Sequence, residues 1–426
     1  MHNPPGGLHC PVTMMSGGSL SRRLVAWVLV GAAFCAGSCS PSKDPAEARA
    51  PEAEPPAIAL APPPAQPEPE MGTPKTFPRP APGGGGEAAG MEDSGRIYSE
   101  VPVYFATDRK RTDALEPDGR FGPERNLEGE HLSYGRAMIT IPKTHRMGTV
   151  ERPVWWRFEF REDVGKHVTL MEPEVMSGEA FYGAMRAAAA VAPGKELLLF
   201  VHGFNVGYAD AMRRTGQLSY DLGFGGITFC YSWPSQGEVA KYLVDKENSE
   251  WTAPHLAKVL GDLQRETRFE KVHVIAHSMG ARVLSLALSE AREAGFSLDL
   301  HNVILAAPDM DADIFREQIL PKIKGSARRL TMYASSGDQA LNLSTKFNGS
   351  RRLGLSGDGL VVVPELMDTV DASGVDTSLL GHSYYGSQGP VAEDLFKLVI
   401  KGLLPPERDL VLGRLGEWDL PGLKPQ

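Results

Sequence analysis

Ser278 occupies a position at which a serine could act as a nucleophile. The residues before it, 272–276, form a short apolar run that is typical of a buried strand, and the spacing of apolar residues over 281–288 predicts a helix. A serine at the apex of a tight turn between a strand and a helix matches the nucleophile elbow, in which small neighbours permit a strained backbone. Gly280 supplies one small neighbour, and Ala276 stands where the motif usually has its first glycine. The alternative is a serine that only caps the helix.

A second stretch predicts the loop that would stabilise negative charge on a substrate. Residues 196–201 form a short apolar run, which predicts a buried parallel strand, and the run ends in His202-Gly203-Phe204-Asn205. Because glycine lets a backbone approach a substrate closely, we predict an oxyanion hole made of the N–H groups of Phe204 and Met279. The supporting residues of this loop are His202, Gly203 and Asn205. The alternative is an ordinary turn that ends a strand.

The position of each histidine along the chain selects the general base. In this motif the order is Ser, then Asp or Glu, then His. Only His301 and His382 follow Ser278. His301 stands at the start of an expected strand, at the wrong edge of a parallel sheet, whereas His382 follows the last strand pattern. We therefore predict that His382 is the base, and that His277 is a packing or loop residue.

Two aspartates compete for the role of the acid. Asp338 follows the strand-like residues 329–334, and Asp309 follows the strand-like residues 303–307. We predict Asp338, because the acid usually follows the penultimate strand. Asp309 remains the alternative acid, and capping of a helix that begins near Asp311 would explain it without catalysis.

The order of the expected elements predicts an α/β fold. Strand and helix patterns alternate from Glu196 onward, which indicates a mostly parallel central sheet with helices on both faces. Upstream, residues 179–192 predict a helix. Residues 101–107, 136–141 and 154–160 resemble antiparallel edge strands, which would form an N-terminal β extension. Together these elements predict the α/β-hydrolase fold.

Several short motifs occur in a fixed order and together carry a resemblance. In chain order they are Val101–Arg109, Ser133–Gly135, Ile141-Pro142, His202–Asn205, Tyr231–Pro234, Ala276–Gly280, Ala306–Asp309, Tyr333–Asp338 and Gly381–Tyr384. The set resembles a bacterial family of uncharacterised α/β-hydrolases that is described as a domain of unknown function. The resemblance spans roughly Tyr98 to Leu403. It implies the fold and a serine-hydrolase triad, and it implies no substrate.

The N-terminus resembles a bacterial export signal. Arg22-Arg23 precede a mainly apolar stretch, 24–34, which is shorter than a membrane span. The small residues Ala36-Gly37-Ser38 then precede Cys39, as in the lipobox of bacterial lipoproteins, whose cysteine carries lipid. We predict an exported protein that Cys39 anchors to a membrane of the cell envelope, at the outer membrane or the periplasmic face. Ordinary cleavage near this point is the alternative.

Composition divides the chain into four segments. Residues 1–39 are the signal segment, and 40–96 are rich in Pro, Ala and Gly, which predicts a disordered tether. The predicted hydrolase domain covers 97–404, and a polar tail of unassigned role covers 405–426.

Composition also narrows the function classes. The formal net charge of -9 argues against a nucleic-acid surface. Of the four cysteines only Cys230 stays in the predicted domain, so no disulfide framework is expected. No metal-ligand spacing and no phosphate loop is present, and we predict neither a metal nor a cofactor. The residues favour a serine hydrolase for a small acyl or ester substrate; an acyltransferase and a non-catalytic envelope-binding lipoprotein remain open.

Overall fold

The computed structural model describes residues 96–154, 159, 161–373, 375 and 389–421. The chain divides into two units, Met1–Lys75 and Thr76–Gln426, and every described residue lies in the second. The predicted signal segment and Cys39 therefore lie outside the described residues, as does most of the predicted tether.

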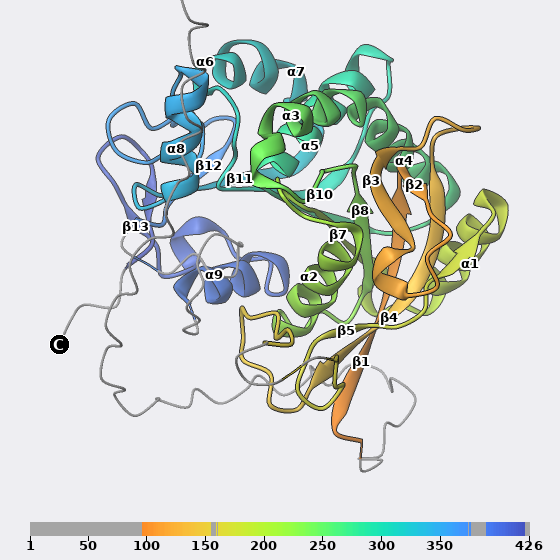
Figure 1. Cartoon of the computed structure of the whole chain (residues 1–426). Helices are drawn as coiled ribbons and strands as arrows, with labels where there is room; N and C mark the ends of the chain where they lie inside the picture. The colour runs from red at the N-terminus through yellow and green to blue at the C-terminus, as the bar shows by residue number, and fades with distance from the viewer. Residues whose placement is uncertain (1–95, 155–158, 160, 374, 376–388, 422–426) are drawn as a thin grey trace, which may run out of the picture. The chain divides into compact units, whose positions relative to one another are not determined.

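A long mixed sheet forms the centre of the described domain (Figure 1). Its strands, in spatial order, are β13 (Val411–Leu412), β14 (Trp418–Asp419), β12 (Asp368–Asp371), β11 (Ala327–Ala334), β10 (Leu300–Ala306), β9 (Lys271–His277), β7 (Glu196–Val201), β8 (Ile227–Ser232), β1 (Tyr98–Thr107), β4 (Ser133–Pro142) and β5 (Thr169–Leu170). The strands from β14 to β1 pair in parallel, while β13, β4 and β5 pair antiparallel to their neighbours. β6 (Glu174–Met176) also pairs with β4, and β2 (Arg109–Arg111) pairs with β3 (Phe121–Arg125).

Helices cover both faces of this sheet. They are α1 (Gly178–Val191), α2 (Tyr208–Asp221), α3 (Tyr242–Trp251), α4 (Ala253–Glu266), α5 (Met279–Glu293), α6 (Ala312–Ile314), α7 (Leu320–Ile323), α8 (Gln339–Asn348) and α9 (Pro390–Val399), with a π-helical turn over Phe315–Ile319. Short 3-10 turns lie at Pro117–Gly119, Pro193–Lys195, Val239–Lys241 and Pro405–Glu407.

Alternation along the central strands explains why both faces are covered. Leu197, Leu199 and Val201 of β7 join the core under α1, α4 and α5. Leu198 and Phe200 point the other way and join the core under α2 and α9. A strand that is apolar at every position must be covered on both sides, as in other parallel sheets. The mostly parallel α/β fold expected from the sequence is confirmed.

The N-terminal β extension differs from its prediction in one respect. β1 is antiparallel to β4, as expected, but it also pairs in parallel with β8, so it lies inside the sheet. The alternation of apolar and polar residues in a strand predicts which side chains are buried. It does not predict which strand pairs with it. Residues 155–158 and 160 of the third expected strand lie outside the described residues.

The C-terminal tail also contributes to the fold. The sequence placed residues 405–426 outside the hydrolase domain, but β13 and β14 extend the sheet beside β12. Arg408 is fully buried, and its Nε lies 3.4 Å from Asp394 Oδ1 of α9. The first part of the tail is therefore packed against the domain.

A buried ion cluster fastens the loop after β4 to the end of α2. His145 Nδ1 lies 2.8 Å from Glu151 Oε2, and His145 Nε2 lies 2.8 Å from Asp221 Oδ1. Burial lowers the pKa of His145, but the hydrogen bonds to Asp221 and Glu151 outweigh it and raise the pKa from 6.5 to about 9. The imidazole is therefore charged at neutral pH, and both of its N–H groups donate.

This cluster predicts a pH-dependent stability. Because the pKa of His145 is higher in the folded state, its contribution is complete below pH 6.5 and is lost as the pH rises through 9. His145→Gln should lower the free energy of unfolding at pH 6 by about 2–3 kcal/mol. Urea unfolding of both proteins at pH 6 and pH 10 measures the difference. A difference that is equally large at the two pH values would contradict the assignment.

Candidate active site

Ser278 lies at a strained turn between β9 and α5. Its φ is 52° and its ψ is −120°, a region that non-glycine residues rarely occupy and that the nucleophile elbow requires. The N–H of Ser278 donates to Ala306 O at 2.9 Å, and its carbonyl accepts from Asp309 N at 3.1 Å. The Ser278 side chain makes no capping hydrogen bond to α5. The alternative role as a helix cap is therefore not what the structure shows.

Gly280 is the point at which the elbow touches the end of β7. A Cβ added to Gly280 would lie 2.6 Å from the carbonyl oxygen of Val201, and closer still to that of His202. Real Cβ atoms are not found so close to backbone oxygen, so only glycine fits. This contact fixes the start of α5 against the loop that follows β7.

Gly203 makes the matching approach from the other side. A Cβ at Gly203 would lie 3.1 Å from Ser278 Cβ and 2.9 Å from His277 Nδ1. The predicted oxyanion loop therefore lies directly beside the predicted nucleophile. Met279 is the first residue of α5, where backbone N–H groups have no partner within the helix. Phe204 N and Met279 N thus come from two segments that are in contact.

His202 is a buried structural residue of this loop. Its ring stacks on Trp233, with centroids 5.1 Å apart, and Trp233 Nε1 donates to His202 O at 2.7 Å. Burial and the neighbouring Arg109 charge lower the pKa of His202 to about 3. The imidazole is therefore neutral, and it holds the loop in place. Asn205, the last residue of the motif, adopts a left-handed conformation with φ 59°.

Arg109 binds the same loop through its guanidinium. The sequence patterns predicted no role for this residue. The residue is 1% exposed, and its guanidinium donates to Val206 O at 2.7 Å, Ser235 O at 2.8 Å and Ser232 Oγ at 3.0 Å. Burial lowers the pKa of Arg109 to about 10, and the group remains charged. The only sequence signal was its place in the Val101–Arg109 motif. The N-terminal β extension therefore supports the site.

Asp338 lies just beyond the carboxyl end of β11 and is buried. Its Oδ1 accepts from Leu341 N at 2.9 Å, so Asp338 caps α8. Nearby, Ser336 N donates to Ser373 Oγ at 2.8 Å, and the segment that contains His382 follows Ser373 in the chain. His382 itself lies outside the described residues.

Asp309 is also buried at this edge, but its carboxylate has other partners. Oδ1 accepts from Ser344 Oγ at 2.7 Å, and Oδ2 accepts from Tyr242 OH at 2.9 Å. Arg352 Nε lies 3.6 Å from Oδ1. The expected capping role of Asp309 is wrong, because Asp311 caps α6 through hydrogen bonds to Asp313 N and Ile314 N. Asp309 instead joins α3 and α8 to the elbow.

The other two histidines that were considered lie as follows. His301 is the second residue of β10, at the amino end of the strand, and its ring lies 5.3 Å from that of His273. It is therefore at the edge opposite Ser278, as expected. His277, the last residue of β9, is buried against Gly203.

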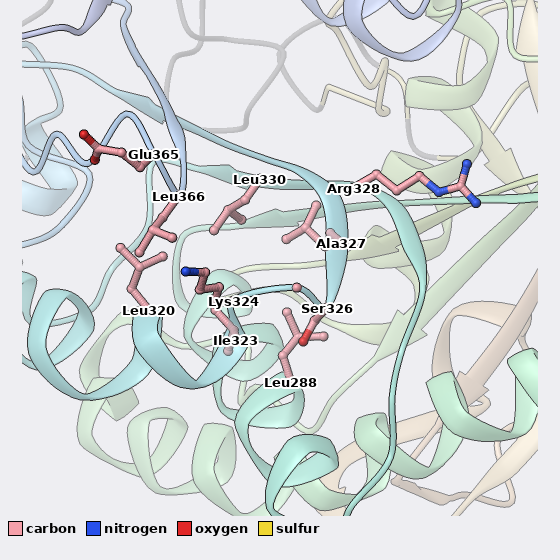
Figure 2. A pocket seen from close by; sticks show the side chains of 12 residues that line it. Leu288, Leu320, Ile323, Lys324, Ser326, Ala327, Arg328, Leu330, Glu365 and Leu366 are labelled. Atoms are coloured by element: carbon pink, nitrogen blue, oxygen red, sulfur yellow. The ribbon is translucent and has the colours of Figure 1, made fainter.

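A crevice of about 250 Å³ opens at the amino edge of the sheet (Figure 2). Leu320, Leu330 and Leu366 lie around it, with Lys324 and Glu365 beside them. Leu288, which also lines it, is ten residues from Ser278 in sequence and thus about 15 Å along α5. The crevice is separate from the elbow.

Two properties of the described part of the chain concern metal binding and membrane spans. Within it, no group of three or more His, Cys, Asp or Glu residues is arranged to hold a metal ion. Across the same residues, no helix is both long and apolar enough to cross a membrane.

Comparison with known proteins gives the family. The profile of a family described as alpha/beta hydrolase of unknown function (DUF900) matches residues 183–398. The chain belongs to this family. The match runs from α1 to α9 and includes the elbow, the loop after β7 and both candidate acids. The family is therefore a hydrolase family by description, and its description names no substrate.

Comparison with solved structures and with curated sequences does not identify a substrate. A fungal esterase from Rhizomucor miehei is 10% identical, with 64% of this chain and 81% of that chain covered and a TM-score of 0.27. Est1E from Butyrivibrio proteoclasticus, solved with ferulic acid, is 14% identical, with 49% and 87% covered and a TM-score of 0.27. At these TM-scores the likeness says nothing about the chemistry of this chain. No curated protein matches its sequence.

The contact at Gly280 predicts a position-specific effect on stability. Gly280→Ala should lower the free energy of unfolding by about 3 kcal/mol or more, because the added methyl meets backbone that cannot move aside. Gly207→Ala is the matched control, since a Cβ there meets nothing within 4 Å. Thermal melts of both variants measure the effect. Equal melting temperatures for the two variants would contradict the close packing of β7 against the elbow.

Proposed function

We propose that this protein is a serine hydrolase that cleaves carboxylic esters through an acyl-enzyme on Ser278. The observation that carries the proposal is the strained elbow at Ser278 packed against Gly203 of the loop after β7. Membership of an α/β-hydrolase family supports the same chemistry at the coarser level of a hydrolase.

In the proposed mechanism Ser278 Oγ attacks the ester carbonyl carbon while His382 accepts the hydroxyl proton. The carbonyl oxygen gains negative charge and accepts hydrogen bonds from Phe204 N and Met279 N. The carbon–oxygen bond to the alcohol then breaks, and His382 returns the proton to the departing alkoxide. Water, deprotonated by His382, then attacks the acyl carbon of the acyl-enzyme. The bond from that carbon to Ser278 Oγ breaks, His382 returns the proton to Oγ, and the carboxylic acid is released. These steps need no metal or organic cofactor, because the N–H groups provide the electrophilic assistance.

Asp338 is the proposed acid of this triad. Its position after β11 supports this role, and two residues before it Ser336 N donates to Ser373 Oγ, which precedes the segment that contains His382 in the chain. Asp309 is the weaker candidate, because Tyr242, Ser344 and Arg352 already surround its carboxylate. Its backbone N–H binds the Ser278 carbonyl, which gives Asp309 a structural role at the elbow.

The sequence also supports a place of action. The basic, apolar and small residues that lead to Cys39 favour export and a lipid anchor on that cysteine. The enzyme would then act in the cell envelope.

Ester turnover tests the proposed function. Ser278→Ala and His382→Ala should each lower kcat for nitrophenyl acetate by about 10³-fold or more, because each removes a partner in proton transfer or attack. Controls are Ser289→Ala in α5 and His301→Ala at the opposite edge, which should retain the wild-type rate within a factor of about three. Wild-type kcat in the Ser278→Ala variant, with its melting curve unchanged, would exclude Ser278 as the nucleophile.

A second pair of variants distinguishes the two acids. Asp338→Asn keeps an oxygen for the cap of α8, so it should stay folded while its kcat falls by about 10³–10⁴-fold. Asp309→Asn should instead lower the free energy of unfolding by about 1–3 kcal/mol with a small loss of rate, because it weakens bonds that join α3 and α8. Rates and melting curves of both variants are the readouts. A large loss of rate in Asp309→Asn alone would reverse the two roles.

A further inference from the structure

Exposed apolar side chains gather on the helices that follow the carboxyl ends of β8, β10 and β11. Among the described residues, the large apolar side chains that are exposed on these helices and the turn before α3 are Val239, Leu243, Val244, Ile314, Leu343 and Phe347. We call this set the apolar rim. Figure 1 shows α3, α6 and α8, which carry it, in the upper part of the view. Other exposed apolar side chains, such as Leu127 and Val191, lie on other elements.

Two helices of the apolar rim, α3 and α8, are bound to one another, and α3 also contacts the site. Tyr242 of α3 shares a 2.9 Å hydrogen bond with Ser344 of α8, and Lys246 Nζ donates to Asn348 Oδ1 at 3.0 Å. The Tyr242 ring also packs edge-on against Phe204, with centroids 5.3 Å apart. Phe204 is the residue whose N–H is proposed for the oxyanion hole, so the apolar rim borders the site.

The spacing within the apolar rim places two of its side chains on a common face. Leu343 and Phe347 are four residues apart within α8, so this pair lies on one side of the helix. Val239 lies in the 3-10 turn directly before α3, and Leu243 and Val244 lie in the first turn of α3. Leu243 is 70% exposed and Phe347 is 74% exposed. Clusters of exposed apolar side chains on a folded domain mark surfaces that contact a partner or a membrane.

We propose that the apolar rim seats on a lipid bilayer and that the substrate of Ser278 is a long-chain acyl ester held in that bilayer. The second part rests on the proposed function. The sequence favours a membrane as the partner of the apolar rim, because Cys39 is the predicted lipid carrier and would attach this chain to a membrane. Cys39 itself lies outside the described residues.

The surface of the described domain decides which of its faces meets the membrane. Seating the apolar rim on a bilayer removes its exposed apolar side chains from water, which favours this orientation. This orientation brings Phe204, which packs against Tyr242 of α3, toward the lipid, so that an ester with a long apolar chain reaches Ser278 from the bilayer.

The test uses the full chain with Cys39→Ser, so that an attached lipid cannot hold it to a membrane. The rim variant adds Leu243→Ser and Phe347→Ser. The control variant adds Leu127→Ser and Val191→Ser, which remove side chains of similar exposure, 71% and 83%. Each protein is measured for co-sedimentation with dioleoylphosphatidylcholine vesicles. Each is also measured for the rate on nitrophenyl palmitate in those vesicles, relative to its rate on soluble nitrophenyl acetate.

The rim variant should bind vesicles at least about tenfold more weakly than the parent, and its ratio of rates should fall by a similar factor. The control variant should match the parent in both. Equal vesicle binding by the rim and control variants would overturn the bilayer contact, even if acetate hydrolysis proves the proposed function. Loss of self-association in the rim variant, with vesicle binding unchanged, would assign the apolar rim to a second copy of the chain. No turnover of either ester by the parent would reject the proposed function and the lipid substrate together, while vesicle binding would still decide the bilayer contact.

Discussion

Two backbone segments meet at Gly280, and the site depends on that contact. The carbonyl oxygens of Val201 and His202 lie where a side chain at position 280 would have to be. The same approach presses Gly203 against His277 and Ser278. Because β7 and β9 are neighbours in the sheet, their following loops leave the same edge and must pass each other there. Glycine on both sides lets them pass in contact, and this brings the Phe204 segment beside Ser278.

The contact is maintained by buried polar groups that come from distant parts of the chain. Arg109, next to β1, donates to the carbonyls of Val206 and Ser235. Its charge is desolvated, and the hydrogen bonds offset that cost only while the two loops stay in place. On the other side, Asp309 joins Tyr242 and Ser344 while its N–H binds Ser278 O. Arg109 of β2, together with α3 and α8, thus fixes the elbow in addition to its own strand and helix.

Some of this could be predicted from the sequence for clear physical reasons. β7 coincides with the expected strand 196–201, because its residues are apolar on both faces and a glycine follows. The carboxyl ends of parallel strands share one edge, so Ser278, Asp309 and Asp338 were expected at the same edge and lie there. Other features depend on tertiary contacts that no local pattern encodes. The buried position of Arg109 and the parallel pairing of β1 with β8 are of this kind. The same holds for the capping aspartate: Asp309 lies three residues before α6 and Asp311 lies directly before it, and only the backbone geometry selects Asp311.

The central claim is that the reacting group is the serine held at the contact between the two loops. Peptide mapping by mass spectrometry after reaction of the folded full-length chain with a fluorophosphonate tests it most directly, since this probe leaves a stable adduct on an activated serine. The account predicts one adduct per chain, on the peptide that contains Ser278, and none after the protein is unfolded before exposure to the probe. An adduct on another serine of the folded protein, with Ser278 unmodified, would contradict it.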